Sequence, residues 1–446
     1  MPLPSEPTVP SDFFSRHLSE QTHALAASTP RVESAFAGAP RQLTDELADA
    51  ADALAGELGD LALDLYEHPE PAFEEHRSAA ALASLLAGHG VEATVGVHGL
   101  ETALRAEFVA GDARRTVAIC AEYDALPGIG HGCGHNVIAA CGVGAFLALH
   151  ALHRRRPDAF AGRVVLLGTP AEEGHSGKEY LAREGAFDGV DAAMMVHSYG
   201  YDLADQVWLG RRVLTVTFHG RPAHASAEPF MGRNALDAAN LMYTGIGLLR
   251  QQMLPVDRVH AIITEGGSRA SVIPETARLD LYARSKYPQT LRDLSARLDD
   301  IAHGAALMAG VGVTVEWDRH PATLPVRTNQ ALTARWATAQ ARRGRTALPL
   351  RVVPETIAAS TDFGNVSYRV PGIHPLIKIA PEGCALHTRE FADAAATPAA
   401  RRAAVDGAFG LAATALDFLC DDDLAAAVAR EFADEGGPVD VEHYFD

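Results

Sequence analysis

The chain has few cysteines, and it has fewer basic than acidic side chains. Its five cysteines, among 446 residues, are too few and too odd in number for a disulfide framework. We therefore expect a reducing, cytoplasmic environment. Lysine and arginine total 38 against 57 aspartates and glutamates, which gives a formal net charge of −19. Because phosphate backbones and anionic lipid repel such a chain, neither nucleic acid nor a membrane is an expected partner.

Several signals of common protein classes are also missing. The N-terminal residues have neither the basic start nor the apolar core of a secretory signal. No uninterrupted apolar run reaches the ~20 residues of a membrane span, and the apolar segment after His135 ends in three arginines, so it predicts a buried helix. The glycines from Gly128 onward do not complete a dinucleotide fingerprint, and no phosphate loop is present. Gly174-His175-Ser176-Gly177 is one residue short of a nucleophile elbow.

The order of the expected helices and strands indicates an α/β protein. The length exceeds one ordinary core, so two domains are expected. Residues 1–40, rich in proline, serine and alanine, predict a flexible arm with one short helix. Helical spacing of apolar residues follows, and then strands alternate with helices, which predicts a mostly parallel mixed sheet with helices on both faces. The expected helices are 43–66, 77–89 and 136–152, and the expected strands are 116–120, 163–168 and 192–196.

A second pattern interrupts the first near Leu209. Its elements follow the order β-α-β-β-α-β, which is typical of a compact α+β, ferredoxin-like domain. The expected strands are 214–219, 259–264, 277–283 and 312–317, and the expected helices are 233–251 and 288–308. We therefore predict one catalytic domain in two parts, 41–208 and 320–446, interrupted by a lid domain at 209–319. A strand at 376–379 and an alanine-rich helix after Pro398 belong to the second part.

Side chains that suit metal ions and acid–base chemistry follow two of the predicted strands. Cys133 and His135 lie two residues apart in a glycine-rich loop, where tight turns let a thiolate and an imidazole converge. Glu172 and Glu173 follow the strand 163–168, and neighbouring side chains of an extended segment point in opposite directions. One carboxylate can therefore bind a metal while the other deprotonates a water as general base.

Four further residues extend this candidate site. His197 follows an apolar strand and His387 lies in a distant loop, and either histidine alone is more often structural. His224 begins the insert, where it is either an exposed loop residue or a donor to a developing oxyanion. Arg284 ends a strand of the insert, where it is either a surface charge or a partner for a substrate carboxylate. Because functional groups gather beyond the carboxyl ends of parallel strands, the combined pattern favours a two-metal hydrolytic site.

One segment identifies a family resemblance. Residues 121–136, AEYDALPGIGHGCGHN, closely resemble the di-metal aminoacylase/carboxypeptidase superfamily, in the branch of amidohydrolases, p-aminobenzoyl-glutamate hydrolases and dipeptidases that carries Cys-Gly-His. The resemblance covers residues 45–417, and its motifs occur in family order. The other motifs are His68-Pro69-Glu70, Glu172-Glu173-Gly174, His197, Gly220–Ala225, Gly232–Ala235, Val272-Ile273-Pro274, Ser360–Asn365 and His387-Thr388.

The resemblance implies two divalent metal ions per chain, zinc or manganese. The implied ligands are Cys133, His135, Glu173, His197 and His387. Glu172 is the implied general base, and Asp124 is implied to support the metal cluster from behind. The insert is implied to be a lid that forms a homodimer, with His224 reaching a partner's active site. The implied substrate contacts are Arg284, Asn234, Ser360 and Thr361.

Three positions depart from the family pattern. The exopeptidases of the wider family begin their metal site with His-x-Asp, whereas this chain has Glu122-Tyr123-Asp124. Asn136 follows Cys-Gly-His where aspartate is common, and Ser271 stands before Val-Ile-Pro where asparagine is frequent.

We therefore expect a metal-dependent amidohydrolase that acts through a metal-bridged water. The expected substrate is an N-acyl amino acid, an aryl-glutamate conjugate or a small dipeptide. A non-catalytic metal-binding or ligand-binding protein on the same scaffold is the alternative. Serine hydrolysis is a third class, which predicts activity that resists chelators.

Overall fold

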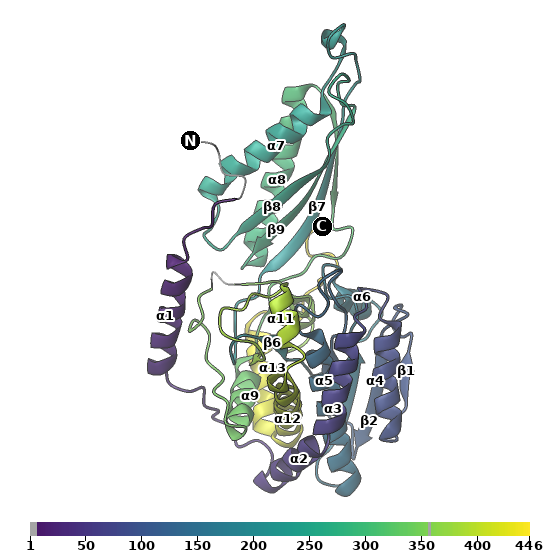
Figure 1. Ribbon diagram of the computed structural model, residues 1–446. Coiled ribbons are helices and arrows are strands. Elements are labelled where there is room, and N and C mark those ends of the chain that lie inside the picture. Colours follow the sequence, from purple (N-terminus) through teal and green to yellow (C-terminus); the bar gives the residue numbers. More distant parts are fainter. Residues whose placement is uncertain (1–6, 356–357) are drawn as a thin grey trace.

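A six-stranded sheet organises the larger domain of the computed structural model, which describes residues 7–355 and 358–446 (Figure 1). The strand order is β1-β2-β4-β3-β5-β11. Strand β3 runs parallel to β4 and β5, and β11 runs parallel to β5, whereas β2 is antiparallel to both β1 and β4. The expected mostly parallel mixed sheet is thus confirmed. The bounds are β1 Ala93–Val95, β2 Leu104–Ala110, β3 Thr116–Ala121, β4 Gly162–Gly168, β5 Ala192–Met194 and β11 Gly372–Ile373.

Helices cover both faces of this sheet because alternate side chains of its central strands are apolar on each side. On β3, Val117 and Ile119 pack into one core, whereas Ala118 and Cys120 pack into another. The first face is covered mainly by α2 (Arg41–Ala53), α3 (Ala55–Glu67), α4 (His76–Gly88), α5 (His135–Arg155), α9 (Gln330–Arg342) and α12 (Pro398–Cys420). The second face is covered by α6 (Gly177–Arg183) and α10 (Phe363–Ser367).

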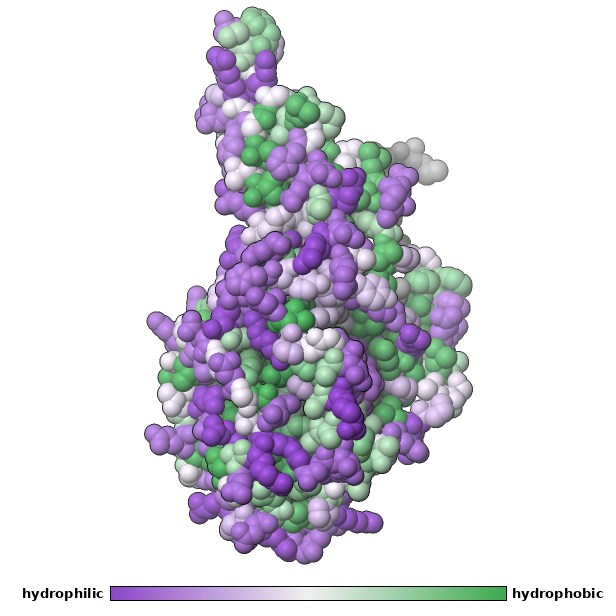
Figure 2. Space-filling view, turned by 180° about the vertical axis from the view of Figure 1, so that it is seen from behind, coloured by the Kyte–Doolittle hydropathy of each residue, from purple (hydrophilic) through white to green (hydrophobic). Residues whose placement is uncertain are grey.

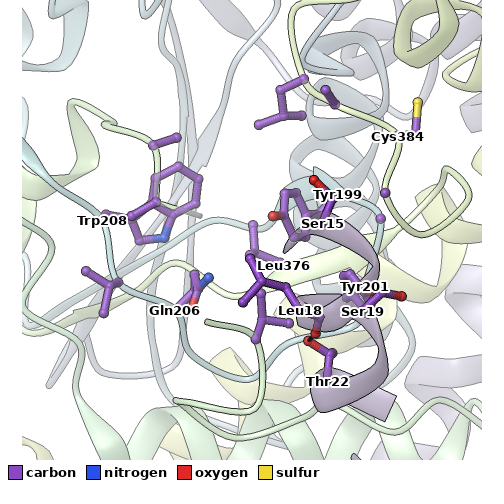
Figure 3. Close-up of a pocket in the computed structure, with 18 residues that line it drawn as sticks. Ser15, Leu18, Ser19, Thr22, Tyr199, Tyr201, Gln206, Trp208, Leu376 and Cys384 are labelled. Carbon is purple, nitrogen blue, oxygen red and sulfur yellow. Dashed lines mark hydrogen bonds between the residues drawn. The ribbon is translucent and has the colours of Figure 1, made fainter. Parts of the chain in front are cut away.

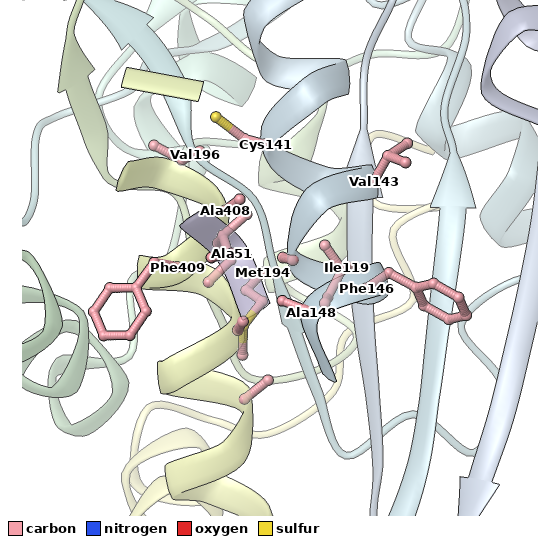
Figure 4. Close-up of a cluster of buried hydrophobic side chains, with 14 of the residues drawn as sticks. Ala51, Ile119, Cys141, Val143, Phe146, Ala148, Met194, Val196, Ala408 and Phe409 are labelled. Atoms are coloured by element: carbon pink, nitrogen blue, oxygen red, sulfur yellow. The ribbon is translucent and has the colours of Figure 1, made fainter. Parts of the chain in front are cut away.

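Helices α5 and α12 approach each other closely at the centre of the first core (Figure 4). A Cβ added to Gly144 of α5 would lie 2.8 Å from Cβ of Ala408, and one added to Gly407 of α12 would lie 2.5 Å from Sγ of Cys141. Both helices are long and apolar enough to cross a membrane by length and composition alone, and α5 is the segment that the sequence predicts to be buried. However, 89% of the apolar window of each helix is buried in the protein, so both are core helices.

The insert is a two-layer domain, made of one sheet and two helices, and it lies above the larger domain in the view of Figure 1. Its antiparallel sheet has the order β10-β7-β9-β8, the ferredoxin-like order that the sequence predicts. Residues of β9 alternate between buried and more exposed, because α7 and α8 cover one face only. The bounds are β7 Gly210–His219, α7 Ala235–Leu249, β8 Arg258–Glu265, β9 Thr276–Ser285, α8 Pro288–Ala309 and β10 Gly312–Trp317.

Exposed apolar side chains mark the outer parts of this insert. Strand β8 lies at an edge of the sheet, where Ile262 is 62% exposed and Ile263 is 41% exposed. Leu248, on α7, is 61% exposed. The rear view in Figure 2 shows hydrophobic residues at the surface of the insert among hydrophilic ones.

Part of the expected N-terminal arm is helical. Helix α1 (Phe13–Ser28) lies beside the insert and the larger domain (Figure 1), and Thr22 is buried. The backbone of Ala39 donates to Oδ1 of Asp417 at 2.7 Å, which ties the end of the arm to α12. Residues 1–6 of the arm lie outside the described residues. Helices α11 (Arg389–Ala394) and α13 (Asp422–Asp434) complete the larger domain.

The strand predicted over 192–196 is shorter in the structure, and a second short strand follows it two residues later. Strand β5 ends at Met194, and β6 (His197–Tyr199) then pairs in parallel with β12 (Leu376–Lys378) in a separate two-stranded sheet. The backbone N–H of His197 donates to the carbonyl of Pro375 at 2.9 Å. This change of sheet places His197 just beyond the carboxyl end of β5.

Candidate metal centre

Several residues of the candidate site lie where three parallel strands end. Asp124 follows β3, Glu172 and Glu173 follow β4, and His197 follows β5. Because β3, β4 and β5 run in the same direction, their carboxyl ends meet at one edge of the sheet.

A left-handed glycine turns the chain between the cysteine and the histidine of the Cys-Gly-His motif. Gly134 has φ +72°, and a Cβ at this position would lie 2.7 Å from Cβ of Ser198. Only glycine combines this conformation with such a close approach. The turn starts α5 at His135 and leaves Cys133 in the preceding loop, so both side chains reach the same pocket.

Six predicted side chains converge in three overlapping groups, in each of which three donor atoms lie within 4.8 Å of one another. The groups are Cys133 with His135 and His197, Cys133 with Glu173 and His387, and His135 with Glu172 and Glu173. The first two groups share only the thiol sulfur. The structure therefore brings the five predicted ligands and the predicted base together, in an arrangement with room for two neighbouring cations.

The two buried histidines present the same ring nitrogen to this centre. Nδ1 of His135 lies 3.0 Å from Oδ1 of Asp124 and 2.9 Å from the Asp124 carbonyl, and Nδ1 of His197 lies 2.8 Å from the Ser198 carbonyl. Because Nδ1 donates in both rings, Nε2 is the nitrogen that offers a lone pair to a metal once the ring is neutral. Nε2 of His135 is buried without a hydrogen-bond partner among the described residues, as expected of an atom that binds a metal.

The charges of the centre favour cations. Burial raises the pKa of the Cys133 thiol well above its usual range, and Glu173 raises it further. Burial, followed by neighbouring carboxylates, also raises the pKa of Glu172 well above its usual range. Burial acts to lower the pKa of His135, but neighbouring carboxylates, led by Asp124, outweigh it and raise that pKa. The raised pKa values mean that these crowded, buried groups keep their protons, which limits the negative charge of the centre. Bound divalent ions would take the place of those protons.

The backbone before the two glutamates is held in an uncommon conformation. Ala171 has φ +58°, and its N–H donates to Oε1 of buried Glu75 at 2.8 Å. The N–H of Glu173 donates to Oδ2 of Asp124 at 2.8 Å. These two hydrogen bonds hold the backbone on both sides of Glu172 and thereby fix the direction in which its side chain leaves the chain.

A buried ion cluster behind the centre was missed by the sequence analysis. Nζ of Lys178 donates to Oδ1 of Asp362 at 2.7 Å and also to Oε1 of Glu122. Oε2 of Glu122 lies 3.4 Å from Nε2 of His135. Lys178, Glu122 and Asp362 are at most 1% exposed. Glu122 departs from His-x-Asp and Asp362 lies in the motif Ser360–Asn365, but nothing in the sequence marks Lys178. Lysine is rarely fully buried unless it is paired.

Comparison with known proteins decides the family. Residues 118–406 match the family described as Peptidase family M20/M25/M40. The chain belongs to this family. The M20 chain is therefore a metal-dependent hydrolase of amide or peptide bonds, and the family resemblance predicted from the sequence is confirmed.

Two curated relatives cover most of the M20 chain. It is 37% identical to a mouse protein named Xaa-Arg dipeptidase over 393 residues, which are 86% of this chain and 91% of the relative. It is 30% identical to one of the subunits of the p-aminobenzoyl-glutamate hydrolase of Escherichia coli, over 86% of this chain and 93% of the relative. A solved Bacillus subtilis protein, titled a dinuclear metal-binding peptidase of family M20, shares the fold with a TM-score of 0.61 at 19% identity, over 82% of this chain and 99% of that chain.

Three of the predicted substrate contacts lie in the M20 chain near the metal centre. Arg284 ends β9, and Glu172 is close enough to act on its pKa. Thr361 is buried, and its Oγ1 accepts from the N–H of Phe363 at 3.3 Å. Ser360 has a buried hydroxyl without a hydrogen-bond partner among the described residues. Their roles toward a substrate stay predictions.

His224 and Asn234 lie elsewhere. His224 is exposed in the loop after β7, where its Nδ1 accepts from the N–H groups of Ser226 and Ala227 at 3.2 and 3.1 Å. Asn234 caps α7 by accepting from the N–H of Leu236 at 3.0 Å. The loop between β7 and α7, which contains both residues, lies at the end of the insert away from the larger domain (Figure 1). A single chain therefore does not assemble them with the candidate ligands.

An apolar cavity of about 420 Å³ adjoins the centre, between α1 and the larger domain (Figure 3). Leu18 of α1, Trp208, Leu376 and Leu386 are among its lining residues, and none of the described lining residues is charged. The Trp208 ring lies 5.4 Å from that of His197. The cavity thus gives the M20 chain an apolar surface beside the candidate ligands.

Proposed function

We propose that the chain hydrolyses the amide bond between an acyl group and the amine of an amino acid. The small-molecule substrate is an N-acyl amino acid, an aryl-glutamate conjugate or a small dipeptide. The convergence of five potential ligands around Glu172 carries the proposal. The names of the relatives, a dipeptidase and a p-aminobenzoyl-glutamate hydrolase, support these substrate classes. The uncharged cavity beside His197 suits an apolar acyl group.

The donor set fits two divalent ions, zinc or manganese. Thiolate and imidazole are preferred by zinc, and carboxylates suit either metal. The residues that would hold the ions are Cys133, His135, Glu173, His197 and His387. When bound, such ions supply Lewis acidity, which lowers the pKa of water toward about 7 and polarises a carbonyl.

Glu172 is placed to move the proton of the reaction. A carboxyl oxygen of Glu172 lies within 4.8 Å of donor atoms of His135 and Glu173. Its carboxylate can accept a proton from the attacking water and then pass it to the leaving amine. A pKa raised by burial makes a carboxylate a stronger base, which suits this double role.

A homodimer through the insert is also proposed. Strand β8 offers an edge, with the exposed side chains of Ile262 and Ile263, on which a second copy can pair. A partner's His224 would then donate to the oxyanion that forms on the substrate carbonyl, since His224 of the same chain lies away from the centre.

Five free cysteines support a reducing, cytoplasmic setting.

The variant Glu172→Gln tests the base assignment. It keeps the size of the side chain and leaves the five ligands unchanged, so we expect normal metal content and dimer formation with loss of turnover. Products from a panel of N-acyl amino acids, aryl-glutamates and dipeptides are measured by mass spectrometry. Normal turnover in the variant would refute the base role. No turnover in the metal-loaded wild-type protein would favour the non-catalytic binding protein.

A further inference from the structure

Two arginines face each other across the insert sheet. In the antiparallel register of β7 and β9, Arg211 lies directly opposite Arg284. Directly opposed residues project from the same face of a sheet, and like charges in such a pair destabilise it. The arrangement therefore costs stability, and an anion between the two guanidinium groups would offset that cost.

Within the described residues, neither guanidinium forms an ion pair, although both Nε atoms are buried and lack hydrogen-bond partners. Arg211 is only 7% exposed, and the one hydrogen bond of its side chain to a described residue runs from Nη2 to Oγ of Ser176 at 3.1 Å. The next residue shows the contrast, because Nε and Nη2 of Arg212 both donate to Asp318, at 2.8 and 2.6 Å. Arg212 therefore has a carboxylate partner within the described residues, whereas the neighbouring Arg211 keeps hydrogen-bond donors without a partner there.

The arginine pair lies beside the metal centre. A Cβ on Gly174, which directly follows the two glutamates of the centre, would lie 3.8 Å from Nη1 of Arg211 and 3.9 Å from the hydroxyl of Tyr282. The Tyr282 ring centroid lies 5.6 Å from Cζ of Arg211 and 5.7 Å from Cζ of Arg284. Burial lowers the pKa of Arg284, Arg211 lowers it further, and Tyr282 and Glu172 act to raise it. An anion at this place would relieve both the burial and the repulsion.

We propose that Arg211 and Arg284 together bind an amine half that carries two carboxylates, so that amides of glutamate or aspartate are the preferred substrates. The inference rests on the proposed amide hydrolysis and narrows its substrate class. Each planar guanidinium can take one carboxylate through two parallel hydrogen bonds.

Charge balance selects a dicarboxylate over a monocarboxylate. Two carboxylates give each guanidinium a direct anionic partner, whereas one carboxylate leaves one guanidinium without such a partner where water has little access. An amine half with a basic side chain would bring a third positive charge to the same place. Arg211 is thus the specificity-determining residue for the second carboxylate.

The test compares aryl amides of glutamate, glutamine and arginine, which share one acyl group. For the metal-loaded wild-type protein we expect kcat/KM for glutamate to exceed that for glutamine by roughly tenfold to a hundredfold, the range of a hydrogen bond to a charged group. Arg211→Met should remove most of this preference, and Arg211→Lys should restore part of it because it keeps the charge without the fork. Equal rates on the glutamate and glutamine amides, or an unchanged preference in Arg211→Met, would overturn the proposal.

Arg258→Met is the matched control. Arg258 lies directly opposite Arg284 on β8, but its Nη1 donates to the carbonyls of Pro255 and Asp257 at 2.6 and 2.8 Å. Arg211, Arg284 and Arg258 thus lie side by side on β7, β9 and β8. Arg258→Met should leave the preference for glutamate over glutamine unchanged, and loss of that preference would count against a specific role of Arg211.

A binding measurement separates the inference from the proposed function. Free glutamate and free glutamine are titrated calorimetrically into the metal-loaded Glu172→Gln variant, with and without Arg211→Met. Tighter binding of glutamate that depends on Arg211 would support the inference even if no amide in the panel is hydrolysed. Equal binding of the two amino acids would overturn it even if hydrolysis is observed.

Discussion

Oδ1 of Asp124 lies 3.0 Å from Nδ1 of His135, and both side chains are closed to solvent. The second oxygen of the same carboxylate accepts from the N–H of Glu173 at 2.8 Å. One acid thereby orients two candidate ligands, one through its ring and one through its backbone. The acid side chain is charged at neutral pH, because His135 lowers its pKa to about 2 even though burial acts to raise it.

Asp124→Asn should weaken metal binding while leaving every ligand in place. The amide keeps one acceptor for His135, but it loses the charge and one of two carboxylate acceptors. We expect a 10- to 100-fold loss of metal affinity, typical of partners behind metal ligands. Competition with a chelator measures it. Asp440→Asn is the control, since that acid also lies 3.0 Å from a histidine, His443, but on the surface. Equal metal affinity in wild type and Asp124→Asn would contradict the assignment.

Lys178→Met should be strongly destabilising. The methionine fits the space, but it leaves the buried carboxylates of Glu122 and Asp362 without their shared cation, which costs roughly 3–5 kcal/mol. Chemical denaturation measures the loss in the free energy of unfolding. Lys378→Met, which removes the partly exposed pair with Glu382, should change it by less than about 1 kcal/mol. Similar losses in the two variants would show that the buried cluster contributes no more to the free energy of unfolding than a surface ion pair does.

Gly134→Ala separates backbone strain from crowding at the Cys-Gly-His turn. A left-handed alanine costs about 1–2 kcal/mol, and overpacking against Ser198 adds about 1–3 kcal/mol. Gly90→Ala is the control, because Gly90 has φ +73° and nothing within 4 Å of the added Cβ. We expect Gly134→Ala to lower both stability and metal content, and Gly90→Ala to lower stability alone. Full metal content in Gly134→Ala would contradict the turn's role.

Metal affinity should rise with pH. The pKa of the Cys133 thiol and that of His135 are both raised above their usual values, so both groups hold protons in the metal-free protein at neutral pH. A cation must displace these protons, and displacement becomes easier as pH increases. We expect weaker binding at pH 6 than at pH 8, together with proton release on binding, which calorimetry in buffers of different ionisation enthalpy detects. Affinity independent of pH would contradict this ligand set.

The sequence predicted the fold where its patterns were periodic. The alternation of strands and helices and the order of elements in the insert are both found in the structure. Strands β1 and β2 were missed, although Leu104–Phe108 alternates apolar with polar side chains, and the polar Arg105 and Glu107 pair with each other on the outer face of β2. The helix predicted over 43–66 is divided at Leu54, where ψ is −3°, far from the ~−42° of an ideal helix. No breaking residue marks that position, since leucine favours helices.

The candidate site was predictable because metal ligands have distinctive chemistry, whereas its supports do not. Cys133 and His135 stand out as a motif, and the structure joins them to the four distant residues expected. Lys178 and Arg211 have no comparable signal, since both types are usually exposed. Their significance lies in burial and in register across strands, and both depend on tertiary packing.

Two metal ions bound by the five named side chains are the central claim, and anomalous diffraction from crystals grown with zinc or manganese tests it most directly. We expect two anomalous peaks about 3.5–4 Å apart, the spacing usual for two-metal sites, with Cys133 beside both. The matched scan after chelation should show neither peak. Peaks only at other positions, or none with ample metal present, would contradict the account.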